Sequence, residues 1–359
     1  MNTQALESTA QKMVADGKGL IAIDESIGTC NKRFAKWDIP QTEEMRRQYR
    51  DLIVTTPGLG ESISGAILFD ETIRQRTNNG TPFAAVLVDT GIIPGIKVDI
   101  GAKPMAACPG EKVTEGLDGL RARLGDYVQM GARFAKWRAV FSIGDGTPSY
   151  ACIEANAHAL ARYAALCQEA GLVPVVEPEV LMEGTHTLDV CSEVTERVLR
   201  TVFRELYSQR VKLGGIILKP NMILPGLDCP HQETAEEIAD ATVACLLRSV
   251  PAAVAGVVFL SGGQSSELAS ARLNAMNIRY KSRLPWQVSF SFGRAIQEPA
   301  LSIWGGKPAN VVPAQEALYH RAKCDRAAHR GTYNTAVELD HRESDRVHTA
   351  TTIYAGSAK

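Results

Sequence analysis

Short apolar runs recur along the chain, and each ends in a polar or charged residue or in a glycine pair. The residues that end these eight runs are Asp24, Asp70, Asp99, Arg138, Glu179, Asn221, Gly263 and Arg294. Successive ends lie roughly 30 to 45 residues apart, which suits one strand and one crossover helix each time. The pattern therefore predicts a series of parallel strands connected by helices.

Helical periodicity fills several of the intervals between these runs. Apolar residues recur with a helical period over residues 187–206, and residues 234–250 and 265–277 also read as helices. Thr234 and Glu237 have the spacing of a capping box at the start of the second of these helices. Eight strands alternating with helices predict a single (β/α)8 TIM barrel, with a doubly wound open sheet as the alternative.

The two ends of the chain and one further run complete the predicted organisation. The first nineteen residues, MNTQALESTAQKMVADGKG, read as an amphipathic N-terminal helix and lack the apolar core of a signal peptide. The apolar run at 82–89 is interpreted as part of the connection into the third strand. We expect residues 1–333 to form the barrel domain and residues 334–359, which lack core periodicity, to form a mobile C-terminal tail.

Composition narrows the class of protein. The 359 residues are 45% hydrophobic and 22% charged, as is ordinary for a globular enzyme. The formal net charge of −1 gives no global field that would attract nucleic acid or a membrane surface. No window approaches the ~18 apolar residues needed to span a bilayer. The eight cysteines contain no CxxC pair and suggest free thiols in a reducing cytoplasm.

Several charged residues lie within the predicted strands, where a two-residue period assigns them to faces. Lys136 and Arg138 share one face of the fourth strand, as Glu177 and Glu179 do on the fifth. Proline avoids central strands, so Pro178 and Pro220 mark strand ends. The pattern therefore predicts that Glu177 and Lys219 lie at the carboxyl end of the barrel, where such barrels keep their active sites.

A converging set of charges at this end is the main functional prediction. Its members are Asp24, Lys97, Lys136, Arg138, Glu177, Glu179 and Lys219. Each residue taken alone is more often a salt-bridged strand end, or a cap of the next helix, than a functional group. They occupy five different predicted strand ends, however, and burying them unpaired would be costly. We therefore expect them to pair with one another and with a ligand.

Glycine-rich turns follow the last two predicted strands. The segment LSGGQS holds Ser261, Gly262 and Gly263, and the segment SFGR holds Ser291, Gly293 and Arg294. A glycine pair before a helix offers backbone N–H groups to an anion. Barrels frequently bind phosphate with the loops after strands seven and eight, so these two turns together predict a phosphate site.

These residues and their neighbours resemble the class I fructose-1,6-bisphosphate aldolase family. The matching segments are AIDES (22–26), NKR (31–33), GIKVD (95–99), FAKWR (134–138), VEPE (176–179), LKPN (218–221), LSGGQS (260–265) and SFGRA (291–295). They follow the family's order over nearly the whole chain. The resemblance implies cleavage of fructose 1,6-bisphosphate to two triose phosphates, without a metal or a cofactor.

The resemblance also implies a role for each central residue. Lys219 should form a Schiff base with the ketose carbonyl, and Lys136 should sit beside it. Glu177 should exchange protons as the imine forms and is hydrolysed, with Glu179 supporting the charge network. Asp24 should handle the proton of the C4 hydroxyl during carbon–carbon cleavage.

Phosphate-binding residues are implied at both ends of the sugar. Ser261, Gly262 and Arg294 should hold the phosphate of the dihydroxyacetone half. Candidates around the other phosphate are Ser26, Lys32, Arg33, Lys97 and Arg138, and Thr29 stands where the family commonly has serine. The family commonly ends in a tyrosine, whereas here the nearest candidate, Tyr354, is followed by AGSAK.

Three rival interpretations stay open at this point. Another Schiff-base barrel enzyme, such as a transaldolase, would not need two phosphate sites. A metal-dependent aldolase is disfavoured because the seven histidines show no HxxxH or HExxH spacing. A non-catalytic scaffold is the third, because the family includes members with cytoskeletal and signalling partners.

The resemblance further implies a homotetramer.

Overall fold

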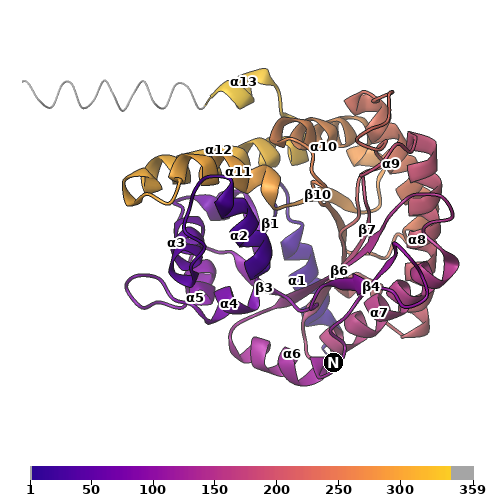
Figure 1. Ribbon diagram of the computed structural model, residues 1–359, viewed down its shortest axis with the longest axis horizontal. Helices are drawn as coiled ribbons and strands as arrows, with labels where there is room; N and C mark the ends of the chain where they lie inside the picture. The colour runs from indigo at the N-terminus through magenta and orange to yellow at the C-terminus, as the bar shows by residue number, and fades with distance from the viewer. Residues whose placement is uncertain (1, 341–359) are drawn as a thin grey trace, which may run out of the picture.

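A computed structural model describes residues 2–340, in which eight parallel strands close into a barrel (Figure 1). The barrel strands are β1 (Gly19–Ile23), β2 (Ile63–Leu68), β3 (Ile93–Lys97), β6 (Phe134–Phe141), β7 (Val173–Val180), β8 (Ile217–Leu218), β9 (Gly256–Phe259) and β10 (Gln287–Phe292). Each strand pairs with its neighbours in chain order, and β10 returns to β1. This closed barrel confirms the predicted fold and excludes the open sheet.

Helices cover the outside of the barrel. They are α2 (Ile27–Ala35), α3 (Glu43–Val54), α4 (Asp70–Arg74), α5 (Phe83–Asp89), α6 (Leu120–Gln129), α7 (Tyr150–Glu169), α8 (Leu188–Ser208), α9 (Ala235–Ser249), α10 (Ser266–Tyr280), α11 (Arg294–Trp304) and α12 (Val311–Arg330). The Thr234 side chain accepts from the Glu237 amide, and the Glu237 side chain accepts from the Thr234 amide, so the capping box is confirmed. Among residues 2–340, no helix is both long and apolar enough to cross a membrane.

Three local features add to the predicted organisation. The apolar run at 82–89 forms α5 within the connection before β3. A hairpin of β4 (Ala102–Pro104) and β5 (Lys112–Thr114) follows β3 and had no counterpart in the sequence pattern. The first residues of the predicted tail form the short helix α13 (Thr335–Leu339), which packs at the end of α12 (Figure 1). Residues 341–359, the rest of that tail, lie outside the described residues.

The interior of the barrel is apolar at the amino ends of the strands. The helix α1 (Thr3–Met13) packs against β2 and β7, and its buried face carries Leu6 and Met13. This face joins Leu20, Phe134 and other inward side chains in one cluster. The Phe134 ring explains a glycine on β3, because a side chain at position 95 would place its Cβ only 2.2 Å from that ring. Packing therefore closes this end of the barrel.

Candidate active site

The inward faces of the strands change from apolar to charged toward their carboxyl ends. On β6 the inward position passes from Phe134 to Lys136, two residues further along. On β7 it passes from Val175 to Glu177. The period of two keeps these side chains on one face, so the strands that build the core also project charges into the mouth of the barrel.

Backbone contacts fix the position of Lys219 immediately after β8. The Lys219 amide donates to the Val176 carbonyl at 2.8 Å, which extends the pairing with β7 by one residue. After Pro220, the Asn221 side chain accepts from the Val180 amide at 2.9 Å and so ties the chain to the end of β7. The Lys219 residue is only 3% exposed, so its amine lies inside the mouth rather than in solvent.

Four side chains form a continuous chain of ion pairs. Lys219 Nζ lies 3.0 Å from Glu177 Oε1, and Lys136 Nζ lies 2.9 Å from Glu177 Oε2. Lys136 also donates to Asp24 Oδ2 at 2.8 Å. Glu177 therefore bridges the two lysines, and Lys136 links Glu177 to Asp24. All four residues are buried, so the predicted pairing among these charges is present in the structure.

The surrounding charges decide which members of this chain are ionised. Burial by itself would raise the pKa values of Asp24 and Glu177, but Lys136 and Lys219 outweigh it and hold both pKa values below their usual range. Burial would lower the pKa of Lys136, but Asp24 and Glu177 outweigh it and raise that pKa. At neutral pH the site thus holds two carboxylates and a fixed cation beside Lys219.

Two further ion pairs lie in the mouth of the barrel, and one of them reaches solvent. Arg138 forms an ion pair with Glu179, and 43% of the Arg138 side chain is exposed. Lys97 Nζ lies 2.6 Å from Asp99 Oδ1, while Asp99 Oδ2 accepts from the Arg138 amide at 3.2 Å. Asp99 thus fixes both the Lys97 ammonium and the end of β6. The Arg138 guanidinium lines the cavity beside Glu179.

The two predicted glycine turns lie next to each other. Gly262 and Gly263 adopt positive φ angles of 58° and 99°, which other residues rarely adopt. A Cβ at Gly263 would lie 2.9 Å from the Arg294 guanidinium, so the two turns meet there. Gly293 caps α11 and Arg294 is its first residue, which directs the unpaired amides of that helix toward the mouth. The arrangement suits an anion.

The next part of the rim comes from the start of α2, which follows β1, the strand beside β10. Ser26 is the N-cap of this helix, and its hydroxyl accepts from the Thr29 amide at 3.3 Å. Arg33 reaches the cavity and pairs with Glu25. Lys32, the neighbouring residue, is exposed and does not line the cavity. The structure therefore brings Arg33, but not Lys32, to the site.

All of these groups border one cavity of about 980 Å³, which is large enough for a sugar bisphosphate. The predicted residues that line it are Asp24, Ser26, Thr29, Arg33, Lys97, Lys136, Arg138, Glu177, Glu179, Lys219, Ser261, Gly262, Gly263, Ser291, Gly293 and Arg294. Tyr354 lies outside the described residues. Arg294 follows β10, Arg138 lies on β6 across the barrel, and Lys219 follows β8 between them, so the cavity can hold a ligand with two anionic ends.

The sequence pattern missed several residues of the cavity. Glu25 lines it and is held at 2.7 Å by Arg50 and at 2.8 Å by Gln297. Asp70 also lines it, although that residue had been recognised only as the end of a strand. Tyr127 donates to Asp70 at 2.8 Å. The position of Glu25, directly after Asp24, was a signal that could have identified it.

In residues 2–340, one group of histidine, cysteine and carboxylate side chains lies close enough to share an ion: His320, Cys324 and Glu338. These residues belong to α12 and α13, and none of them lines the cavity. The mouth of the barrel presents lysines, arginines and carboxylates that already pair with one another.

Comparisons with known proteins agree on one family. The family model for fructose-bisphosphate aldolase class-I matches residues 5–354. A probable fructose-bisphosphate aldolase class 1 from Xylella fastidiosa (strain 9a5c) is 59% identical over 324 residues, covering 90% of this chain and 96% of that protein. Fructose-bisphosphate aldolase B from Gallus gallus is 47% identical, covering 98% and 96%. A solved fructose-bisphosphate aldolase from Plasmodium falciparum, in complex with TRAP and an inhibitor, superimposes with a TM-score of 0.91 at 47% identity, covering 92% of this chain and 95% of that one.

Proposed function

This chain belongs to the class I fructose-bisphosphate aldolase family, and from that premise we propose that it cleaves fructose 1,6-bisphosphate reversibly to dihydroxyacetone phosphate and glyceraldehyde 3-phosphate. The reaction takes place in the mouth of the barrel, with Lys219 as the covalent catalyst. The observation that carries the proposal is the placement of Glu177 between two lysine amines, at 3.0 and 2.9 Å. This arrangement gives one lysine a nearby proton acceptor and a permanent cationic neighbour.

Imine formation is the first chemical step. A lysine attacks a carbonyl only as the free amine, so Lys219 must first pass a proton to an acceptor such as the Glu177 carboxylate. The Lys219 nitrogen then bonds to C2 of the ketose. The C2 oxygen takes up protons and leaves as water, for which Glu177 is the donor in reach. The product is a protonated imine that withdraws electrons from C2.

Cleavage of the C3–C4 bond follows. The bonding pair moves toward C2 and forms an enamine on Lys219, while the C4 hydroxyl proton passes to a base and C4 becomes the aldehyde. Asp24 is the proposed base because it is ionised and lies in the same ion-pair chain, with Lys136 between it and Glu177. Protonation at C3 and hydrolysis of the imine then release dihydroxyacetone phosphate and restore Lys219.

Phosphate binding at two ends orients the sugar over Lys219. We assign one phosphate to Ser261, Gly262, Gly263 and Arg294, with Ser291 and Gly293 shaping the same turns. The other phosphate falls to Ser26, Thr29, Arg33, Lys97 and Arg138, and Lys32 is the weakest candidate because it is exposed. Fixing both ends lowers the entropic part of the barrier. Tyr354 is proposed to exchange the proton on the enamine carbon.

Comparing two substrates tests the two-phosphate assignment. Fructose 1,6-bisphosphate should be cleaved far better than fructose 1-phosphate, because the latter leaves the Arg33 rim without an anion. Equal rates would indicate a substrate with a single phosphate, as another Schiff-base barrel enzyme would use. Cleavage should also persist after EDTA treatment, and loss of activity with the chelator would contradict the imine mechanism.

Assembly and location complete the proposal. We propose a cytoplasmic homotetramer, in line with the relatives from Arabidopsis thaliana that are named cytosolic. Sedimentation of the purified chain tests the tetramer. Cytoskeletal partners are a further proposal, and a Lys219→Met variant that binds such a partner without turnover would separate this role from catalysis.

A further inference from the structure

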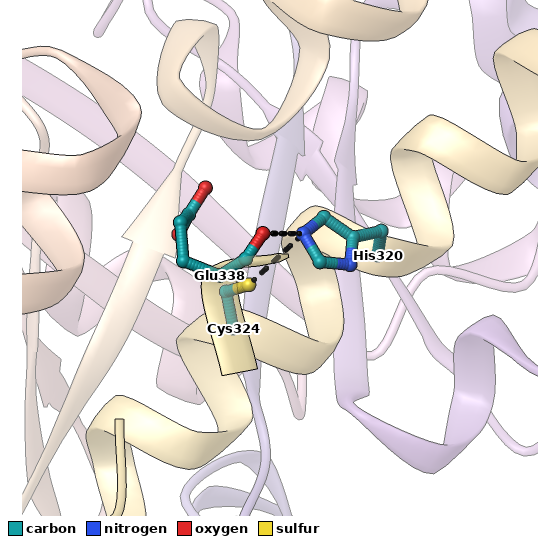
Figure 2. A group of neighbouring side chains, drawn as sticks. All are labelled: His320, Cys324 and Glu338. Atoms are coloured by element: carbon teal, nitrogen blue, oxygen red, sulfur yellow. Dashed lines mark hydrogen bonds between the residues drawn. The ribbon is translucent and has the colours of Figure 1, made fainter. Parts of the chain in front are cut away.

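Outside the active site, a histidine, a cysteine and a glutamate converge where α13 packs on α12. Figure 2 shows His320 and Cys324, one turn apart on α12, directed toward the Glu338 residue of α13. One possible ligand atom from each of the three side chains lies within 4.8 Å of the other two. His320 and Cys324 are buried, and Glu338 is partly buried. The cluster thus joins α12 to α13, the last two helices of the described residues.

One distance in this cluster, between the histidine nitrogen and the cysteine sulfur, matches that between two ligands of a tetrahedral zinc ion. Bonds of about 2.3 Å to sulfur and about 2.0 Å to nitrogen place those two atoms roughly 3.5 Å apart. His320 Nε2 and Cys324 Sγ lie 3.5 Å apart. Glu338 offers a carboxylate oxygen within 4.8 Å of the other two ligand atoms, while its backbone carbonyl accepts a hydrogen bond from His320 Nε2 at 3.1 Å. One nitrogen, one thiol sulfur and oxygen ligands form a donor set that zinc prefers.

Neighbouring groups hold the glutamate in place. Tyr333 donates to Glu338 Oε2 at 2.6 Å, and Arg321 forms an ion pair with Oε1. Arg321 in turn donates to Ser270 of α10 at 3.0 Å. Such outer partners orient metal ligands in proteins, and a carboxylate retains lone pairs for a metal after accepting one hydrogen bond per oxygen. The Arg321 charge weakens the attraction of the cluster for a cation.

We propose that His320, Cys324 and Glu338 bind one zinc ion that clamps α13 onto α12. On binding, the Cys324 thiol loses its proton to solvent and forms the Zn–S bond, while the His320 ring proton moves from Nε2, which donates to the Glu338 carbonyl, to Nδ1 and the ring bonds to the ion through Nε2. The thiolate offsets one positive charge of the ion, and the Glu338 carboxylate is shared between the ion and Arg321. Zinc is able to displace the proton of a coordinating thiol.

The consequence of the clamp concerns α13 itself, the last helix among the described residues. The ion would fix α13 to α12, in the same way that a structural zinc ion holds a small domain together. The aldol chemistry itself does not use this ion, because none of its three ligands lines the catalytic cavity. Zinc removal should therefore loosen α13 while leaving the covalent chemistry at Lys219 intact.

Cobalt substitution tests the site on the full-length protein. The chain is dialysed against EDTA, then titrated with Co²⁺ and, in competition with a fluorescent chelator, with Zn²⁺. We expect one ion per chain and a near-ultraviolet thiolate-to-cobalt absorption band. Cys324→Ser should lose this band, whereas Cys245→Ser, which changes another buried cysteine on α9, should retain it.

Two further variants keep the test decisive if Cys324→Ser does not fold. His320→Gln and Glu338→Gln should each weaken Zn²⁺ binding by at least about tenfold. Zinc should also slow hydrogen exchange of the α13 amides in the wild type alone. The proposal is overturned if the wild type gives no thiolate-to-cobalt band, or if the variants bind Zn²⁺ as tightly as the wild type. Fructose 1,6-bisphosphate cleavage, measured in parallel, reports separately on the catalytic proposal.

Discussion

The two ends of the barrel interior are built by the same strands and differ in almost every physical property. At the amino end, the inward residues of β6 and β7 are Phe134, Val173 and Val175, packed against α1. One step further along the same faces are Lys136 and Glu177, buried but charged. A two-residue advance along a strand therefore separates a dry core from an ion-pair network.

This contrast teaches how one scaffold separates stability from chemistry. The amino end buries apolar surface, which favours folding and carries no reactive group. The carboxyl end buries charges, whose desolvation is offset only by the pairs that they form with each other. Substitutions at the two ends should therefore have opposite signatures, one in the free energy of unfolding and the other in turnover.

The largest expected effect follows from removing the proposed nucleophile. Lys219→Met deletes the amine while keeping a side chain of similar length, so kcat for fructose 1,6-bisphosphate should fall by at least about 10⁴-fold. Steady-state kinetics measures the loss, and circular dichroism checks the fold. Lys212→Met, which changes an exposed lysine before the same strand, is the matched control and should keep wild-type turnover. Comparable turnover rates for the two variants would contradict the assignment of Lys219 as the nucleophile.

Neutralising the bridging carboxylate should have the next largest effect. Glu177→Gln keeps the shape of the side chain but removes the proton acceptor between Lys136 and Lys219, so kcat should fall by about 10²- to 10⁴-fold. KM should change less than kcat, because the phosphate-binding residues are untouched. Separate fits of kcat and KM distinguish the outcomes. A variant with normal kcat and a raised KM would mean that Glu177 only binds substrate.

The apolar end should respond in stability instead. Phe134→Ala removes a fully buried ring from the barrel interior, and the free energy of unfolding should fall by about 3 to 5 kcal/mol. Turnover per folded molecule should stay near the wild-type value. Urea unfolding measures the first quantity, and activity normalised to the folded fraction measures the second. A fall in normalised activity as large as that of Glu177→Gln would erase the distinction between the two ends.

Acid should reveal the smaller stabilising effect of the charged end. The pKa values of Asp24 and Glu177 are lowered in the folded state, so their contribution to stability is complete above the unfolded values of about 3.9 and 4.3 and declines as the pH falls below them. The urea midpoint should therefore drop between pH 6 and pH 3. Asp24→Asn should lower the midpoint at pH 6 and show a shallower drop. Parallel curves for the two proteins would contradict this account.

Much of the fold was predictable because its signals are local and repeated. Apolar runs that end in a polar or charged residue or in a glycine pair marked all eight barrel strands, and the capping-box spacing of Thr234 and Glu237 marked the start of α9. The hairpin of β4 and β5 was not predictable, because three-residue strands carry too little pattern and their pairing depends on a long turn. The helix α13 was not predicted from the sequence for a related reason, because it depends on contacts with another helix, such as the ion pair between Glu338 and Arg321.

The candidate site was predictable to the extent that strand geometry determines it. A period of two placed Lys136 and Glu177 correctly on inward faces, and Pro220 placed Lys219 at a strand end. Helix geometry was harder to read, since neighbouring residues on α2 point about 100° apart. The pattern could not tell that Arg33 faces the cavity while Lys32 faces solvent.

Hydrogen-bond and ion-pair partners that come from distant segments could not be predicted from the sequence. Glu25 is held by Arg50 of α3 and Gln297 of α11, and only the closed barrel brings those helices to the end of β1. No local signal in the sequence specifies such a network, because each member reads alone as an ordinary surface charge or amide.

Trapping the covalent intermediate tests the central claim most directly. The protein is incubated with dihydroxyacetone phosphate, reduced with borohydride, digested and mapped by mass spectrometry. The account predicts one reduced adduct per chain, located on Lys219, and none in Lys219→Met. An adduct on another lysine, or no adduct in an active preparation, would contradict it.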